Sequence, residues 1–371
     1  MNIKNSKRLV VKVGSALVTK KDGTINKEWL DAFSQGIAKL RDNGTDVVVV
    51  SSGAVSLGRK SIGITKSKNN MRLEQKQAAA ACGQVLLVEE YRKTFTKHDI
   101  NIGQVLLTIE DSENRRRYLN ARSTFQTLLE ARIIPIVNEN DTVATEEIRV
   151  GDNDRLAARV AQMIEADFLV LFSDVDGLYT SNPMVNKKAK HIPIVEKIDD
   201  KIMAMAGGAV SQESSGGMAT KVEAARIATR SGCNTIITAG KGMNPVEDLL
   251  NGCKHTIFIA KGNPGSARKK WIGDTLIITG EVVVDDGAAK ALSKGKSLLP
   301  AGVTEVRGNF ERGDAVLVVS AIGEEIGRGL VAYSKADAER IIGHNSSDIE
   351  KILGYSGRDA LIHRNDLVLS N

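Results

Sequence analysis

Residues 47–55 read VVVVSSGAV, four consecutive valines followed at once by two serines and a glycine. An unbroken β-branched run is typical of a strand that is buried on both faces, as in a parallel sheet covered by helices. The small residues after it suit a tight turn in which backbone amides approach a ligand closely. This stretch therefore predicts an α/β protein with ligand-binding residues at the carboxyl ends of its strands.

The rest of the first 260 residues alternates in the same way between short apolar runs and helical patterns. We expect further strands at 9–13, 102–107, 133–137, 168–172 and 236–239, and helices at 29–41, 75–91, 119–131, 156–164 and 218–229. This alternation predicts a three-layer α/β/α sandwich with a mostly parallel sheet.

The pattern changes near residue 260. Residues 261–271, KGNPGSARKKW, are rich in glycine, proline and charge and read as a linker or exposed loop. Short β-like pieces follow at 275–279, 281–284 and 315–319, with glycines between them, and predict a small, mostly antiparallel β-barrel. The expected organisation is a domain of residues 1–260, a linker of residues 261–278, and a barrel domain with a C-terminal tail in residues 279–371.

Length and composition exclude several classes of protein. At about 150 residues per domain, 371 residues allow two or three domains. Hydrophobic residues make up 42% and charged residues 26%, which excludes disorder as the main theme. No apolar run approaches ~18 residues, and the N-terminus lacks the apolar core of a signal peptide, so no membrane partner is expected. The scattered Cys82, Cys233 and Cys253 argue against disulfides or structural zinc and predict a cytoplasmic location.

The net charge of +6 lies in the first part of the chain, because residues 261–371 hold 15 Lys and Arg and 15 Asp and Glu. A mild positive surplus suits a site for phosphates or carboxylates. It is too small to predict a nucleic-acid-binding stripe by itself.

Common signatures of nucleotide and hydrolase sites are absent: we find no GxxxxGK[ST], GxGxxG, HExxH or GxSxG. Polar clusters instead follow the predicted strands or open the predicted helices. They are Lys12–Ser15, Ser51–Ala54, Asn138–Asp141, Gly151–Asp154, Ser173–Tyr179 and Ser215–Lys221. Each alone has a plain explanation, such as a snorkelling lysine, a turn, a helix cap or a flexible loop. Six of them at one sheet edge are hard to explain by chance.

The residue types in these clusters favour phosphoryl transfer. Lys12 and Lys221 come from separate elements and would neutralise a phosphoryl group, while the glycine-rich loop before Lys221 offers backbone amides at a helix N-terminus. This chemistry needs positioning and charge neutralisation more than a covalent intermediate. Asp141 suits an ammonium group and the neighbouring asparagine amides suit a carboxylate. No His or Cys stands in a nucleophile position, which argues against acyl-enzyme chemistry.

These motifs resemble the amino-acid kinase family. The matching segments are VVKVGSALVT (10–19), VVVVSSGAV (47–55), GQVLLT (103–108), PIVNENDTVAT (135–145), VGDNDRLAARVA (150–161), SDVDGLYTSNP (173–183) and SSGGMATK (214–221). The tail resembles a PUA domain in GEVVVDDGAAKAL (280–292) and GNFERGDAVLVV (308–319). The VNEND and VGDND pair resembles the members that phosphorylate the γ-carboxylate of L-glutamate, rather than those that act on aspartate, acetylglutamate, carbamate or uridylate.

The resemblance implies a reaction in which ATP phosphorylates L-glutamate to γ-glutamyl phosphate, the first step of proline biosynthesis. It implies catalytic roles for Lys12, Lys221, Asp154 and Gly14, with Asp154 holding the two lysines and Asp152 assisting. The implied substrate-binding residues are Ser52, Gly53, Ala54, Asn138, Asp141 and Asn153. The implied ATP-binding residues are Lys12, Ser173, Asp174, Ser215, Gly216, Gly217, Met218, Ala219, Thr220 and Lys221. Mg²⁺ is implied as well, held mainly by phosphate oxygens, with no protein ligand assigned.

The resemblance further implies proline as an inhibitor near Asn138–Asp141, self-association into a homo-oligomer, and a downstream glutamyl phosphate reductase. Two alternatives stay open at this point. One is another acid kinase on the same scaffold, and the other is an RNA-binding protein that acts through the PUA domain. The neutral charge of residues 261–371 and the aromatic content of only 4% argue against RNA.

Overall fold

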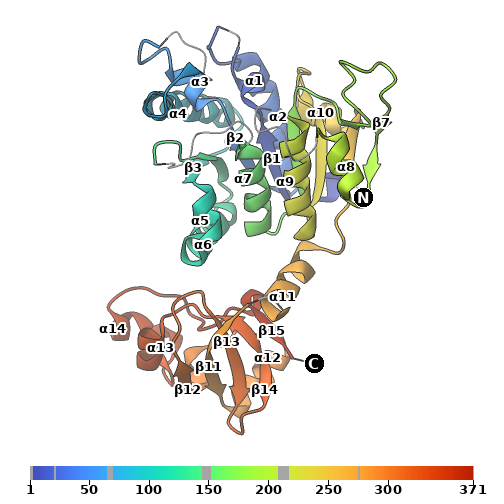
Figure 1. The fold of residues 1–371 in the computed structure, drawn as a ribbon. Helices are drawn as coiled ribbons and strands as arrows, with labels where there is room; N and C mark the ends of the chain where they lie inside the picture. Colours follow the sequence, from blue (N-terminus) through green and yellow to red (C-terminus); the bar gives the residue numbers. More distant parts are fainter. Residues whose placement is uncertain are drawn as a thin grey trace. The chain divides into compact units, whose positions relative to one another are not determined.

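Two separate units make up the chain, Met1–Pro264 and Gly265–Asn371 (Figure 1). The computed structural model describes residues 3–20, 22–64, 70–143, 152–207, 217–274 and 276–370. No described helix combines the length and the apolar character that crossing a membrane requires.

An eight-stranded sheet forms the centre of the first unit, in the order β3-β4-β2-β1-β5-β9-β10-β8. Its strands are β1 (Arg8–Val13), β2 (Asp46–Ser51), β3 (Ile102–Leu107), β4 (Ile134–Glu139), β5 (Phe168–Ser173), β8 (Ile194–Val195), β9 (Asn234–Ala239) and β10 (His255–Phe258). All neighbouring strands are parallel except β9 and β10. A short antiparallel pair, β6 (Leu178–Tyr179) and β7 (His191–Ile192), stands apart from this sheet.

Helices cover both faces of the sheet. They are α1 (Ser15–Val18), α2 (Lys27–Asp42), α3 (Ala54–Gly58), α4 (Leu73–Thr96), α5 (Ile109–Glu113), α6 (Arg115–Glu130), α7 (Asp152–Met163), α8 (Asp200–Met205), α9 (Met218–Arg230) and α10 (Pro245–Leu250). One buried cluster joins the sheet to α2, α4 and α10, and another joins its opposite face to α6, α7 and α9. The three-layer sandwich and the mostly parallel sheet expected from the sequence are therefore confirmed.

The alternation of side chains along β1 decides where its lysine points. Leu9, Val11 and Val13 belong to the cluster with α2 and α4, whereas Val10 belongs to the cluster with α7 and α9. Successive side chains of a strand point to opposite faces, so Lys12 shares the face of Val10. Lys12 therefore faces the layer that contains α7 and α9.

Helices α3 and α4 approach each other more closely than side chains larger than hydrogen would allow. A Cβ atom on Gly58 would overlap the backbone oxygen of Ala79, and one on Gly83 would overlap the backbone oxygen of Ala54. This contact holds the middle of α4 against the turn that follows β2. The packing of α3 against α4 therefore helps to position the turn after β2, where the polar cluster Ser51–Ala54 lies.

The second unit has its own sheet, in the order β12-β11-β13-β14-β15, in which only β11 and β13 pair in parallel. Its elements are α11 (Pro264–Asp274), β11 (Ile278–Val284), α12 (Asp286–Ser293), β12 (Val303–Gly308), β13 (Ala315–Ser320), β14 (Glu325–Leu330), α13 (Lys335–Ile341), α14 (Ile349–Leu353) and β15 (Leu367–Leu369). A separate buried cluster, with Val282, Val316 and Leu361 among its members, forms its core.

Part of the stretch expected as a linker or loop is a helix, and two expected β pieces are one strand. Residues 264–274 form α11, whose Arg268 makes a buried ion pair with Asp366 near the C-terminus. Residues 278–279, the end of the piece expected at 275–279, join the piece expected at 281–284 in the continuous strand β11, because Gly280 stays in the ladder between Gly308 and Val316. Thr275 lies outside the described residues.

Replacing Gly83 should destabilise the first unit. Gly83→Ala is expected to lower the free energy of unfolding by ~1–3 kcal/mol, because the added methyl group must push α4 away from α3. Urea unfolding followed by tryptophan fluorescence measures the change. The exposed Ala81 on the same helix provides a control, since Ala81→Ser should stay within about 0.5 kcal/mol of the unsubstituted protein. Equal unfolding midpoints for the two variants would contradict the close approach of the helices.

Candidate active site

A buried aspartate joins the two lysines that the sequence singles out. Asp154, in the first turn of α7, has a side chain that is 0% exposed. Its Oδ1 lies 2.6 Å from Nζ of Lys12 on β1, and its Oδ2 lies 3.0 Å from Nζ of Lys221 on α9. Lys12, Asp154 and Lys221 therefore meet, although they belong to three different elements, β1, α7 and α9.

The N-terminus of α9 is held to the same carboxylate. Thr220 donates a hydrogen bond from Oγ1 to Oδ2 of Asp154 at 3.0 Å and lies 2.9 Å from the backbone oxygen of Gly217. Gly217 is the residue before the first turn of α9, and no atom of the described residues lies within 4 Å of the position that its Cβ would occupy.

The cluster carries one more positive charge than negative charge. Burial lowers the pKa of Lys12 below its usual range; the charge of Asp154 opposes this shift and that of Lys221 adds to it. Burial alone would raise the pKa of Asp154, but the two lysines outweigh it and hold that pKa below its usual range. An excess buried charge is costly unless an anion shares the site. The cluster therefore suits a multiply charged anion.

Gly14 and the end of β5 lie next to Lys12. A Cβ on Gly14 would stand 4.0 Å from Nζ of Lys12, so a larger side chain would occupy space beside the ammonium group. At the end of β5, Ser173 is buried and donates from Oγ to Oδ1 of the exposed Asp174 at 3.0 Å. The negative charge of Asp174 also raises the pKa of Lys12, although burial outweighs it.

The structure brings most of the expected ATP-binding residues together and leaves two outside its description. Met218, Ala219, Thr220 and Lys221 form the first turn of α9, which begins after Gly217. Ser215 and Gly216 lie outside the described residues, as does the side chain of Asp152.

Hydrogen-bonded side-chain amides form a chain that starts at Asn153, the neighbour of Asp154, and runs along the edge of the sheet. Asn153 donates from Nδ2 to Ser52 Oγ at 2.9 Å and to Asn138 Oδ1 at 3.1 Å. Asn138 donates in turn from Nδ2 to Oε1 of Gln84 on α4, at 2.7 Å. Two atoms of this chain, Gln84 Nε2 and Asn153 Oδ1, are buried with no hydrogen-bond partner in the described part of the protein. They are free to bind a polar ligand.

The remaining expected substrate-binding residues border this chain. Gly53 has φ of 118°, which a residue with a side chain adopts only under strain, and it precedes α3. Ala54 is the first residue of α3 and is buried. Asp141 lies in the turn after β4 and is only 8% exposed. Residues 52–54, 138, 141 and 153 thus follow β2 and β4 or open α7.

Gln84 belongs to this hydrogen-bonded chain, and the sequence did not single it out. It lies in the alanine-rich stretch of α4, where the helical pattern predicts packing rather than ligand binding. Its signal was a glutamine directly after Gly83, the glycine that lets α4 approach the Ser52–Ala54 turn. That signal has meaning only once α3 and α4 are known to pack together.

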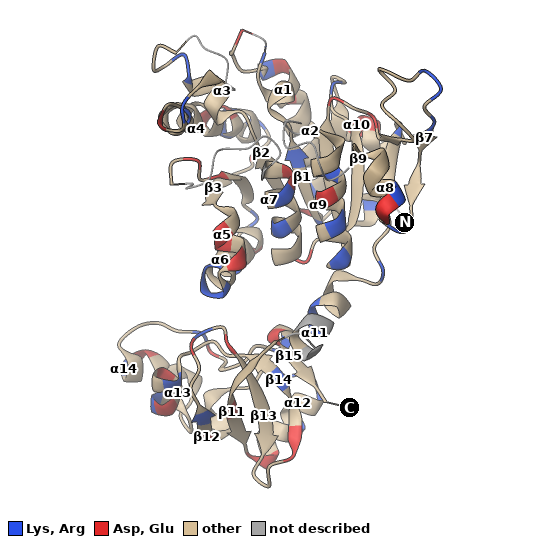
Figure 2. Cartoon of the chain, in the orientation of Figure 1, with Lys and Arg blue, Asp and Glu red and all other residues tan. Residues whose placement is uncertain are grey.

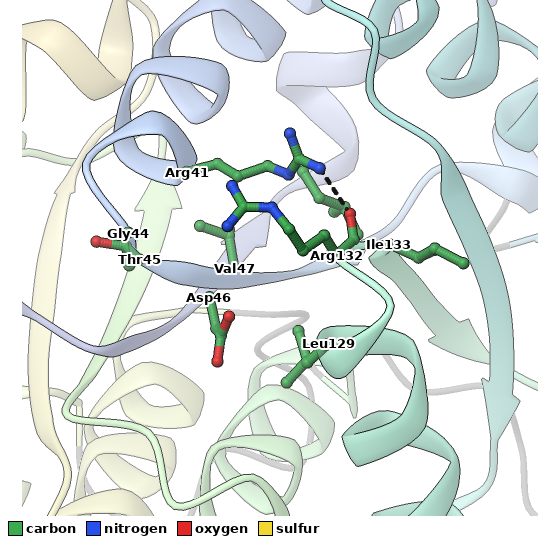
Figure 3. Close-up of a pocket in the computed structure, with 9 residues that line it drawn as sticks. Arg41, Gly44, Thr45, Asp46, Val47, Leu129, Arg132 and Ile133 are labelled. Carbon is green, nitrogen blue, oxygen red and sulfur yellow. Dashed lines mark hydrogen bonds between the residues drawn. The ribbon is translucent and has the colours of Figure 1, made fainter.

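A small pocket lies at the opposite end of the sheet, where β2 begins (Figure 3). Its lining residues are Arg41, Gly44, Thr45, Asp46, Val47, Leu129, Arg132, Ile133 and Ile134. Arg41 donates to the backbone oxygen of Arg132 at 2.9 Å across it. None of the expected site residues lines this pocket.

The surface of the first unit does not explain a preference for anions. Figure 2 shows basic and acidic residues interspersed over its helices. Among the described residues, no group of three or more His, Cys, Asp or Glu side chains could hold a metal ion. The positive charges at the cluster itself are those of the buried Lys12 and Lys221.

Comparison with known proteins identifies both units. Residues 7–239 match the model of the amino acid kinase family, and residues 280–353 match that of the PUA domain. The chain is 53% identical to a glutamate 5-kinase of Agrobacterium fabrum, over 98% of this chain and 93% of that protein. It is also 53% identical to a glutamate 5-kinase of Paramagnetospirillum magneticum, over 98% of both chains. A solved carbamate kinase from Giardia lamblia, bound to AMP-PNP, shares the fold with a TM-score of 0.50 at 15% identity, over 70% of this chain and 100% of that chain.

Loss of the central carboxylate should strongly destabilise the protein. Asp154→Asn leaves two buried ammonium groups without their anion, and we expect the free energy of unfolding to fall by about 3–5 kcal/mol. Glu247→Gln is the matched control, because its ion pair with Lys39 is about half exposed and should be worth no more than about 1 kcal/mol. Urea unfolding compares the two. Similar losses would contradict the central role of Asp154.

Proposed function

The chain belongs to the amino acid kinase family, and from this membership and the geometry of its site we infer that it transfers the γ-phosphoryl group of ATP to the γ-carboxylate of L-glutamate. The products are γ-glutamyl phosphate and ADP, and the reaction is the first step of proline biosynthesis. The observation that carries this inference is the buried Lys12–Asp154–Lys221 cluster, in a chain that resembles glutamate 5-kinases over nearly its whole length.

Charge neutralisation is the main task of the reaction. A γ-carboxylate oxygen attacks the γ-phosphorus while the bond to the leaving oxygen of ADP breaks, so two anions must come together. We propose that Lys12 and Lys221 neutralise the transferring phosphoryl group and that the Gly14 amide donates to it. Asp154 holds the two ammonium groups at one point, and Asp152 assists.

Glutamate binds, in this proposal, along the amide chain. Ser52 and the backbone amides of Gly53 and Ala54 lie at one end, next to Asn153, and support the γ-carboxylate. Asn138 and Asp141 lie after β4, and the Asp141 carboxylate suits the α-ammonium group.

ATP binds on the other side of β1. We propose that Ser173, Asp174 and the loop from Ser215 through Gly216, Gly217, Met218, Ala219 and Thr220 to Lys221 line its site. Mg²⁺ would accompany the nucleotide and be held mainly by phosphate oxygens. We assign it no protein ligand.

Other parts of the proposal follow from the family resemblance. They are inhibition by proline near Asn138–Asp141, a homo-oligomer, a cytoplasmic location, and consumption of the product by a glutamyl phosphate reductase. Residues 1–260 would carry catalysis, with residues 261–278 as a linker and residues 279–371 as a PUA-like domain. The neutral charge of residues 261–371 argues against a role in RNA binding.

A substrate panel with hydroxylamine tests the reaction itself. We expect hydroxamate from L-glutamate, ATP and Mg²⁺, because hydroxylamine traps an acyl phosphate, and little or none from aspartate or acetylglutamate. A folded protein that forms no hydroxamate from L-glutamate would rule the function out. Greater turnover of aspartate or acetylglutamate would favour another acid kinase.

The two parts of the site should respond differently to substitution. Lys12→Ala and Lys221→Ala are expected to lower kcat by ~10²-fold or more, because each removes a charge that stabilises the transition state. Asp141→Ala should mainly raise the KM for glutamate. Initial rates over a matrix of ATP and glutamate concentrations separate these effects. The same kinetic change in all three variants would contradict the division of roles.

The pH dependence of kcat/KM should report Lys12, because this quantity follows the titration of the free enzyme. Burial lowers the pKa of Lys12 below its usual range, so its positive charge is lost as pH rises through that lowered pKa. The rate at low substrate concentrations should therefore begin to fall at a lower pH than the titration of an ordinary lysine would give. Lys12→Arg keeps its charge over this range, so its lower residual rate should stay level. An equal alkaline fall in the variant would assign the titration to another group.

A further inference from the structure

We propose that Gln84 is a substrate-binding residue that donates a hydrogen bond from its side-chain amide to the α-carboxylate of L-glutamate, and so selects substrates that carry this group. The inference rests on the proposed function. It extends it to a residue of α4, a helix on which the family resemblance placed no site residue.

The packing of α4 brings Gln84 to the site. Its neighbour Gly83 touches the backbone of Ala54, the first residue after the Ser52–Gly53 turn. Helices α3 and α4 lie side by side along this contact (Figure 1). The side chain of Gln84 reaches from there to Asn138 at the end of β4.

A single backbone amide determines how the amides of the chain are oriented. The backbone N–H of Glu139 lies 2.9 Å from Oδ1 of Asn138, and a backbone N–H can only donate. That atom of Asn138 must therefore be the oxygen, so its amide nitrogen faces Gln84. Gln84 in turn must present its oxygen to Asn138, which leaves its NH₂ group directed elsewhere.

The same reasoning applies to Asn153 at the other end. Asn138 Oδ1 accepts from Asn153, so Asn153 presents its nitrogen to Asn138 and to Ser52. The oxygen of the Asn153 side chain, Oδ1, takes no part in these two hydrogen bonds. The chain thus ends in a buried donor, Gln84 Nε2, and a buried acceptor, Asn153 Oδ1, neither of which has a partner among the described residues.

Buried polar groups that lack partners in the protein are suited to bind a ligand that supplies them. An amino acid carries carboxylate acceptors and an ammonium donor, so it can supply partners of both kinds. The NH₂ group of Gln84 can donate to a carboxylate and cannot accept from an ammonium group. It therefore recognises the carboxylate.

The position along the sheet distinguishes the two carboxylates of glutamate. Asn153 is the neighbour of Asp154, which binds Lys12 and Lys221, so the γ-carboxylate belongs at that end. Gln84 lies at the other end of the chain, because Asn153 bonds to Asn138 on β4 and Asn138 bonds to Gln84. The α-carboxylate is the acidic group that remains for it.

The test is the preference between L-glutamate and L-isoglutamine, which has a carboxamide in place of the α-carboxylate and keeps the γ-carboxylate. Gln84→Glu keeps an oxygen for Asn138 but replaces the donor by a carboxylate. We expect kcat/KM for glutamate to fall about 10- to 100-fold, mainly through KM, because a charge-assisted hydrogen bond is lost. The value of kcat/KM for isoglutamine should fall less than that for glutamate, or rise, since the amide of isoglutamine can donate to the new carboxylate.

Gln104→Glu, an exposed position on β3, is the control for the added charge and should leave the preference unchanged. Where turnover of isoglutamine is too slow to measure, the rise in thermal unfolding midpoint with each ligand gives the same comparison. Equal losses for both ligands, or no loss, in Gln84→Glu would overturn the assignment. Failure of the unsubstituted protein to form hydroxamate from glutamate would instead overturn the proposed function.

Discussion

The ion pairs of Asp154 are the interaction on which the rest of the site depends. Two ammonium groups buried side by side repel each other and have lost their hydration, so their burial is costly. The carboxylate between them offsets this cost and holds the two side chains together. It also links β1, α7 and α9, so the same contact serves both the fold and the charge of the site. The remaining positive charge is left for an anionic ligand.

The order of the strands gives the site a direction. Lys12 comes from β1 at the centre of the sheet, Ser52 follows the adjacent β2, and Asn138 ends β4 beyond it. The charged end of the site therefore lies at the middle of the sheet, and the neutral amide chain extends outward from it. An amino acid with two acidic groups fits this arrangement, because one group meets the lysines and the other meets the amides.

Much of the fold and of the candidate site could be predicted from the sequence, because these features depend on short-range patterns. The strand expected at 102–107 is β3 with the same bounds, and four of the polar clusters lie at the ends of β1, β2, β4 and β5. The C-terminal unit was less predictable. Gly280 reads as a break in the sequence but continues β11, because partners on both sides hold its backbone in the ladder. The helix α11 is stabilised by a buried pair between Arg268 and Asp366, residues that no local pattern connects.

The sequence by itself determined the alternation of elements and the residue types at the sheet edge, since both follow from the order and spacing of neighbours along the chain. Only the tertiary structure decided which groups meet. The approach of α3 and α4 brings Gln84 to Asn138, and one backbone N–H of β4 then sets the direction of every amide in the chain. Contacts between distant segments and the orientation of a planar amide leave no periodic signal in a sequence, because both depend on three-dimensional packing.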